Sequence, residues 1–263
     1  MKVAESGNAG AAPARPPAYA RWVSLQAGHL ALLLQAMVRV GALRNEMVRI
    51  VYLREVYHMG VQGLPTIALL AAVTGTLLVV EATELLGAGN SYVYDLVGWL
   101  LVTEAAPLLV AIVIAGRSAT VVATELALLQ VRGEVRSLER MRIEVVDYLV
   151  VPRIAALTVS LTAATLYYEV IAIAGGFGAA ALFLQVSYEE QTRLLLEALS
   201  AGALVLTAVK TVIFGLAIGT VACYAGLNAG TTVEQVPLAQ VRAFMRALTC
   251  VVLIDLLFAL PAF

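Results

Sequence analysis

Apolar residues dominate the chain from about position 64 onward, and short polar segments interrupt them. Five apolar runs are long enough to cross a bilayer, which takes roughly 20 helical residues. They cover about 64–86, 96–129, 149–184, 198–225 and 244–263. The pattern predicts an all-α integral membrane protein with five transmembrane helices in a domain spanning 61–263.

The residues before this domain follow a different pattern. Leucines and valines over 19–60 alternate with arginines such as Arg39, Arg49 and Arg54. This mixture predicts amphipathic helices lying in the membrane interface, and a pair of soluble amphipathic helices is the alternative. Residues 1–18 are rich in Ala, Pro and Gly without a continuous apolar stretch, so we expect a disordered tail and not a secretory signal.

Basic residues are distributed unevenly among the loops. Of 17 lysines and arginines, seven precede the first run, five lie in the second loop and two in the fourth. Only Arg193 lies in a loop on the opposite side, and Arg117 and Lys210 lie inside runs. Because cytoplasmic loops collect Lys and Arg, the N-terminus and the second loop are predicted to be cytoplasmic and the C-terminus to lie outside.

The composition argues against a soluble enzyme or a nucleic-acid-binding protein. Hydrophobic residues make up 61%, charged residues 13%, and the mean hydropathy is +0.90. His29, His58, Cys223 and Cys250 lack metal-ligand spacing, so no cofactor is expected in this chain. The glycines over 175–178 lack the Lys-Ser/Thr of a phosphate loop, and we expect them to let helices pack closely. ATP, if used, must therefore bind another chain.

Ionisable residues inside the apolar runs are the strongest functional candidates. Each costs roughly 2.5–3.5 kcal/mol at the bilayer centre, so they should pair or line a polar cavity. Glu104, just before Ala105-Ala106-Pro107, is interpreted as a cavity residue, and Arg117 with Glu125 as part of an ion network. Contact with headgroups is the alternative for three that lie near run ends: Glu81, Glu84 and Asp255.

The polar segment 130–147 between the second and third runs has apolar residues at helical spacing. It predicts a cytoplasmic amphipathic helix that docks into a groove on a partner. A solvated helix lying on headgroups is the alternative. The predicted docking residues are Arg132, Glu134, Arg136, Leu138, Glu139, Arg140, Arg142 and Glu144.

Several motifs occur in a specific order. They are Glu104 with Pro107, then Ala115-Gly116-Arg117, Glu125, the 130–147 segment, Pro152-Arg153, Lys210 and Ile254-Asp255. In order and spacing they resemble the MlaE/YrbE permeases of ABC transporters that work with MCE-domain proteins. The resemblance covers about residues 50–263. Thr103 and Ala105-Ala106 depart from the Arg and Leu-Gly usual in that family.

The resemblance implies a five-span permease in the bacterial inner membrane, with a periplasmic C-terminus. A second copy would complete a homodimer, and a separate cytoplasmic ATPase dimer would bind ATP and Mg and dock on a coupling helix at 130–147. An MCE-domain ring would lie on the far side, and a STAS-domain regulator is a further candidate partner. The substrate would be phospholipid or another hydrophobic lipid.

By the same resemblance, lipid would enter a cavity at the dimer interface. Its candidate lining residues are Glu104, Thr103, Pro107, Glu81 and Leu78. The candidate intramembrane ion network comprises Arg117, Glu125, Glu169, Lys210 and Asp255. Two other classes stay open: a transporter or channel driven by ion gradients, with Glu81, Glu84, Glu104 and Glu169 as ion sites, and a non-transporting membrane scaffold.

Overall fold

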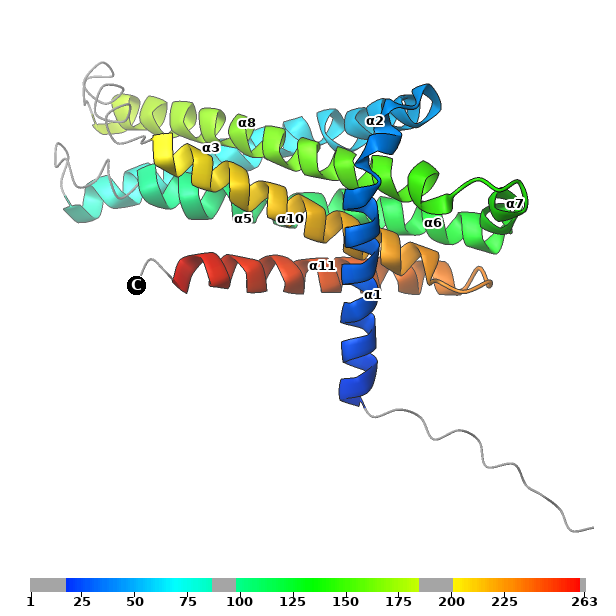
Figure 1. Ribbon diagram of the computed structural model, residues 1–263. Coiled ribbons are helices and arrows are strands. Elements are labelled where there is room, and N and C mark those ends of the chain that lie inside the picture. The colour runs from blue at the N-terminus through cyan, green and yellow to red at the C-terminus, as the bar shows by residue number, and fades with distance from the viewer. Residues whose placement is uncertain (1–17, 87–97, 185–200, 261–263) are drawn as a thin grey trace, which may run out of the picture.

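The computed structural model describes residues 18–86, 98–184 and 201–260, and all secondary structure in these ranges is helical. Long helices lie side by side along one direction (Figure 1). They are α3 (Leu64–Leu86), α5 (Ala106–Ile114), α6 (Thr120–Val131), α8 (Val151–Leu184), α10 (Ala201–Leu227) and α11 (Gln235–Ala259). The all-α prediction is confirmed.

Within the described ranges, four continuous helical stretches are long and apolar enough to cross a membrane: Glu46–Ala82, Leu100–Val131, Val146–Gly176 and Gly202–Leu227. The chain is therefore a multi-pass membrane protein. The fifth predicted span corresponds to α11, which starts at Gln235 rather than at 244. Its first half carries Arg242 and Arg246, and its second half is mostly apolar, with Asp255 as its one charged residue.

Two of the long stretches contain wider, π-helical turns. The second span is built from η3 (Leu100–Ala105), α5, η4 (Ala115–Ala119) and α6, where η3 and η4 are π-helical. A third π-helical segment, η5 (Val146–Val150), leads into α8. Single π turns inside α-helices are uncommon and concentrate at functional positions.

The N-terminal helices differ in how they meet this bundle. α1 (Ala18–Val38) runs across the long helices rather than along them (Figure 1), and the His29 ring packs 4.3 Å from the Tyr224 ring of α10. η1 (Val40–Arg44), α2 (Glu46–Met59) and η2 (Val61–Gly63) then lead into α3. Because α2 packs on α8 and buries Val48 and Met59, it is part of the bundle wall. An interfacial position stays a prediction for α1.

Small residues bring α3 and α8 into close contact. A Cβ atom added at Gly176 would lie 2.7 Å from the backbone oxygen of Gly75 and from Val79 Cγ2. Gly175 packs on Ala72, and Gly75 packs on the backbone of Ala172. The close packing predicted for the 175–178 glycines is confirmed for Gly175 and Gly176. Small residues at such contacts let helix backbones approach in a membrane, where dispersion forces drive association.

We expect Gly176→Ala to destabilise the bundle, because the new methyl group overlaps the α3 backbone at a cost of about 1–3 kcal/mol. The thermal midpoint of the detergent-solubilised protein measures this. Gly178→Ala is the matched control, since a Cβ there meets nothing within 4 Å. The helix-propensity gain of about 1 kcal/mol should leave Gly178→Ala unchanged or more stable. Equal midpoints for the two variants would contradict the packing.

Candidate functional site

A buried lysine joins three of the spans. The side chain of Lys210 on α10 is only 1% exposed, and its Nζ lies 2.8 Å from Glu104 Oε2 and 2.6 Å from Asp255 Oδ1. Glu104 comes from η3 and Asp255 from α11, and their side chains are 27% and 19% exposed. A buried cation is tolerated when carboxylates and hydrogen bonds replace its hydration. We call these three residues the Lys210 cluster.

The π-helical turn at η3 supplies further acceptors for α10. Pro107 has no N–H to donate to the carbonyl of Thr103, four residues back, and Lys210 Nζ donates to that oxygen instead at 3.0 Å. The N–H of Ala106 bonds to Leu101 O, which leaves the oxygen of Val102 for Thr207 Oγ1 at 3.0 Å. The sequence Glu104-Ala105-Ala106-Pro107 thus places one carboxylate beside α10 and leaves two backbone carbonyl groups free to accept hydrogen bonds from α10.

A second buried cation joins α2, α6 and α8. The Arg153 side chain is 8% exposed, with Nε 3.3 Å from Glu55 Oε1 and Nη2 donating to Glu125 Oε2 at 3.1 Å. Its Nη1 donates to Leu149 O at 3.1 Å. We call Arg153, Glu55 and Glu125 the Arg153 cluster. It occupies the part of the bundle nearest α7 (Glu134–Arg140).

Arg117, from the Ala-Gly-Arg motif, lies near the Arg153 cluster but belongs to a different contact. Its Nη2 donates to Gln62 Oε1 at 3.2 Å, and its Nη1 is buried without a hydrogen-bond partner among the described residues. A Cβ at Gly63 would lie 2.8 Å from Nη1, so this glycine provides the space for the guanidinium group.

The predicted ion network is thus divided. Lys210 and Asp255 share one cluster and Glu125 belongs to another, whereas Arg117 pairs with neither. Glu169 is buried on α8, and its Oε1 has no hydrogen bond among the described residues. Helical spacing alone predicted a link between Arg117 and Glu125, but Arg117 bonds to Gln62 in η2 and Glu125 to Arg153 in α8.

The lipid-cavity candidates lie on two separate spans. Thr103 is buried and donates to Trp99 O at 2.6 Å, and Pro107 lies in the first turn of α5, so both belong to the same span as Glu104. Leu78 packs against the core from α3, and Glu81 is exposed further along that helix. Glu104 is an ion-pair partner of Lys210, and its role in a lipid cavity stays a prediction.

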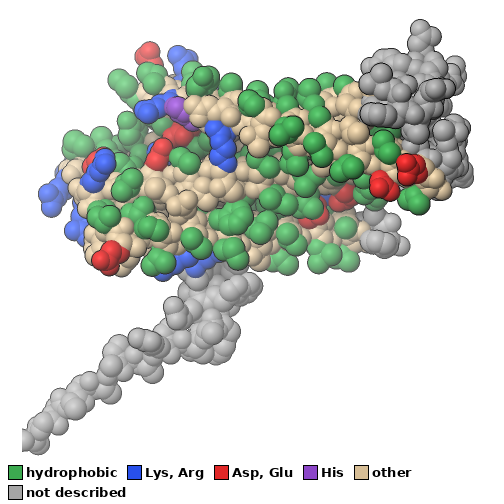
Figure 2. All heavy atoms as spheres, turned by 180° about the vertical axis from the view of Figure 1, so that it is seen from behind, with side chains coloured by type: hydrophobic (Ala, Val, Ile, Leu, Met, Phe, Trp, Pro, Cys, Tyr) green, Lys and Arg blue, Asp and Glu red, His purple; other side chains and the backbone are tan. Residues whose placement is uncertain are grey.

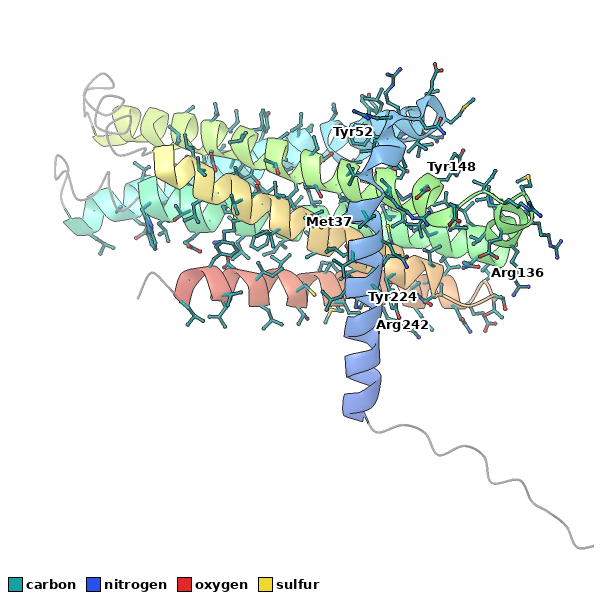
Figure 3. The ribbon with its side chains drawn as sticks, viewed as in Figure 1. Met37, Tyr52, Arg136, Tyr148, Tyr224 and Arg242 are labelled. Carbon is teal, nitrogen blue, oxygen red and sulfur yellow. The ribbon has the colours of Figure 1, made fainter. Side chains whose placement is uncertain are left out.

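The helix within the predicted docking segment is shorter than predicted. Within 130–147, α6 ends at Val131 and only Glu134–Arg140 forms α7, because Gly133 and Arg142 take left-handed backbone angles with φ of 73° and 59°. Val135 anchors α7 in the core, while most of its charged side chains face outward, including Arg136 at the end of the bundle (Figure 3).

An exposed arginine from the N-terminal part of the chain forms ion pairs with this segment. Arg39 Nη1, just after α1, donates to Asp147 Oδ1 at 3.1 Å and lies 3.3 Å from Glu144 Oε2. The hydrogen bond and charge of Asp147 raise the pKa of Arg39 above its ordinary value. Sequence reasoning missed this contact, together with Glu55 and Thr207, and it named Arg153 only as part of the Pro152-Arg153 motif. Each of these residues had one available signal, a polar side chain placed in or beside an apolar run.

We expect Lys210→Met to destabilise the protein by about 3–5 kcal/mol, because it leaves two carboxylates in the bundle without their cation. Glu104→Gln should cost much less, since Asp255 still neutralises Lys210. Thermal midpoints in one detergent compare the two variants, with the exposed Arg242→Gln as the control. Lys210→Met melting together with the control would disprove a stabilising role for the cluster.

In the part of the chain that the structure describes, no three His, Cys, Asp or Glu side chains gather in a possible metal site. The arrangement instead consists of paired charges, freed carbonyl groups and an exposed charged segment. Such an arrangement can hold helices in register and transmit their movement.

Comparison with known proteins places this arrangement in a family. Residues 52–260 match the family model described as Permease MlaE, a range that contains both ion clusters and α7. A probable ABC transporter permease protein of Rickettsia typhi is 28% identical over 184 residues, covering 68% of this chain and 70% of that protein. Similar proteins of Rickettsia prowazekii and Rickettsia felis, with the same name, are 27% and 26% identical over the same shares of both chains. The chain therefore belongs to the MlaE permease family.

Proposed function

We propose that this chain is the permease subunit of a bacterial ABC transporter that moves phospholipid or another hydrophobic lipid between the inner membrane and the outer envelope. The observation that carries the proposal is the MlaE family match across 52–260. The relatives, each named a probable ABC transporter permease, support the transporter class. A permease of this class depends on a separate ATPase, so ATP and Mg are expected in the partner.

The exposed segment around α7 is the proposed ATPase-docking site. Arg136, Glu139, Arg140 and Arg142 are exposed, and Met141 and Ile143 add apolar surface beside them. Charged and apolar groups together on α7 and the residues just after it suit docking into a groove. Lysine and arginine side chains gather at this end of the bundle, and acidic ones predominate toward the other (Figure 2). This asymmetry supports a cytoplasmic α7 and a periplasmic C-terminus.

The second permease copy is proposed to pack on α11, which lies at one edge of the bundle (Figure 1). Its outward face is apolar in its second half, where the exposed side chains are Val252, Leu253, Leu256, Leu257 and Leu260. A lipid cavity at this interface would be bordered by the Lys210 cluster through Asp255. The MCE-domain ring would meet the periplasmic end, and a STAS-domain regulator stays a candidate on the cytoplasmic side.

The geometry gives less support to an ion-driven transporter. Glu81 and Glu84 are exposed on α3, Glu104 pairs with Lys210 on another span, and Glu169 is buried separately on α8. These four carboxylates do not form a connected path among the described residues. An ion pathway normally needs polar groups in sequence along one cavity.

The docking proposal predicts that Arg136→Glu with Arg140→Glu abolishes co-purification of an ATPase co-expressed from the neighbouring genes. Charge reversal opposes the partner's surface, whereas both arginines are exposed and the fold should persist. The matched control, Arg136→Lys with Arg140→Lys, keeps the charge and should retain most of the ATPase. Full retention by the reversed variant, with an unchanged melting midpoint, would refute docking through α7.

The cavity proposal predicts that Glu104→Gln keeps the ATPase bound but lowers lipid transfer between labelled donor and acceptor vesicles by about tenfold, the effect of roughly 1.4 kcal/mol. The reason is that the charge beside the proposed lipid path is lost while the fold is retained. Transfer that follows a proton gradient and ignores ATP would support the ion-driven class. Unchanged transfer would remove Glu104 from the lipid path.

A further inference from the structure

A cavity of about 640 Å³ lies between α2, α6 and the start of α8, separate from the Lys210 cluster. Four arginines line it, Arg54, Arg117, Arg132 and Arg153, against two glutamates, Glu55 and Glu125. Blue, red and purple side chains lie close together on the face seen in Figure 2, near the basic end of the bundle.

The charges in this cavity do not balance. Arg153 contacts two carboxylates, Glu55 and Glu125, and Arg132 lies 3.7 Å from the exposed Glu134. The four arginines with these three glutamates leave a net charge of +1. Neither Arg54 nor Arg117 forms an ion pair with any residue that the structure describes. The cavity therefore retains positive charge, and an anion would complete it.

Arg117 presents a donor that lacks an acceptor. Gln62 accepts from Nη2 at 3.2 Å and fixes the guanidinium plane, while Nη1 is buried and has no hydrogen bond among the described residues. A buried donor without an acceptor is unfavourable, so a ligand oxygen at Nη1 would stabilise the site. The fork of a guanidinium group matches the oxygens of a phosphate.

The rest of the lining indicates a ligand with an apolar part. Val51, Val121, Leu128 and Leu129 share the cavity with the arginines, and Val121 is 52% exposed on the outer surface of its helix. A free phosphate ion would gain nothing from contact with these apolar side chains, whereas the glycerol and first acyl carbons of a lipid would pack against them. Basic pockets between spans at the cytoplasmic surface bind anionic headgroups for the same reason.

We propose that this cavity binds the phosphate headgroup of an anionic phospholipid from the leaflet nearest α7. Arg117 and Arg54 donate to the phosphate oxygens, and Gln62 positions Arg117. The bound lipid would be a resident ligand that fills the space between α2 and α6, apart from any lipid carried at the dimer interface. The site requires only that this end of the bundle meets a membrane leaflet, and it does not depend on the transport proposal.

The test measures phosphatidylglycerol retained by the full chain after purification from nanodiscs of equal phosphatidylglycerol and phosphatidylcholine. Arg117→Gln should lower retained phosphatidylglycerol by about tenfold, the worth of one charge-assisted hydrogen bond. Arg49→Gln is the matched control, because Arg49 is exposed on α2 and lies outside the lining.

If Arg117→Gln does not fold, Arg54→Gln serves in its place, because Arg54 is exposed and forms no ion pair with the described residues. Equal losses in Arg49→Gln and the cavity variants would reduce the effect to general surface charge and overturn the proposal. Displacement of phosphatidylglycerol by millimolar inorganic phosphate would identify a free-phosphate site and overturn the lipid assignment. Preferential retention of phosphatidylcholine would do the same.

Discussion

A cation buried among apolar helices is stable only when neighbouring carboxylates balance its charge. Two such cations, Lys210 and Arg153, hold the helices of this bundle together. Lys210 holds the second span, α10 and α11 together through Glu104 and Asp255. Arg153 does the same for α2, α6 and α8 through Glu55 and Glu125. Removing the cation leaves two carboxylates without their counter-charge, so each cluster fixes the relative position of its helices.

The two clusters act at different depths along the same second span. Glu104 lies in η3 near one end of that span, and Glu125 lies in α6 near the other. The backbone also contributes at η3, where Pro107 and the π-helical turn leave carbonyl groups for Lys210 and Thr207. A side-chain ion pair and two freed carbonyls thus connect the second span to α10, which explains why Glu104 and Pro107 occur three residues apart.

The sequence was sufficient to predict the all-helical class, the multi-pass membrane character and the small-residue contact at Gly175 and Gly176. Each of these depends on local composition or on a single helix face. The ion partners could not be predicted, because Glu104 and Lys210 are 106 positions apart and Glu125 and Arg153 are 28 apart. Which polar face of a helix meets which neighbour depends on the rotation of both helices. The shortened α7 depends on left-handed residues at Gly133 and Arg142, and helical periodicity carries no information on the second.

The position of α7 relative to these clusters determines how a movement there would spread. α7 lies between α6 and the start of α8, and Arg153 joins these two helices, so a displacement of α7 moves them as a pair. Arg39 adds the end of α1 to the same unit through Asp147. α11 receives such a movement by two routes, directly from α6 and η4, on which it packs, and along the second span through Glu104 and Lys210. The π-helical turns of η4 and η3 lie on the second route, and because their hydrogen bonding is irregular they are the points at which the span can bend without breaking either cluster.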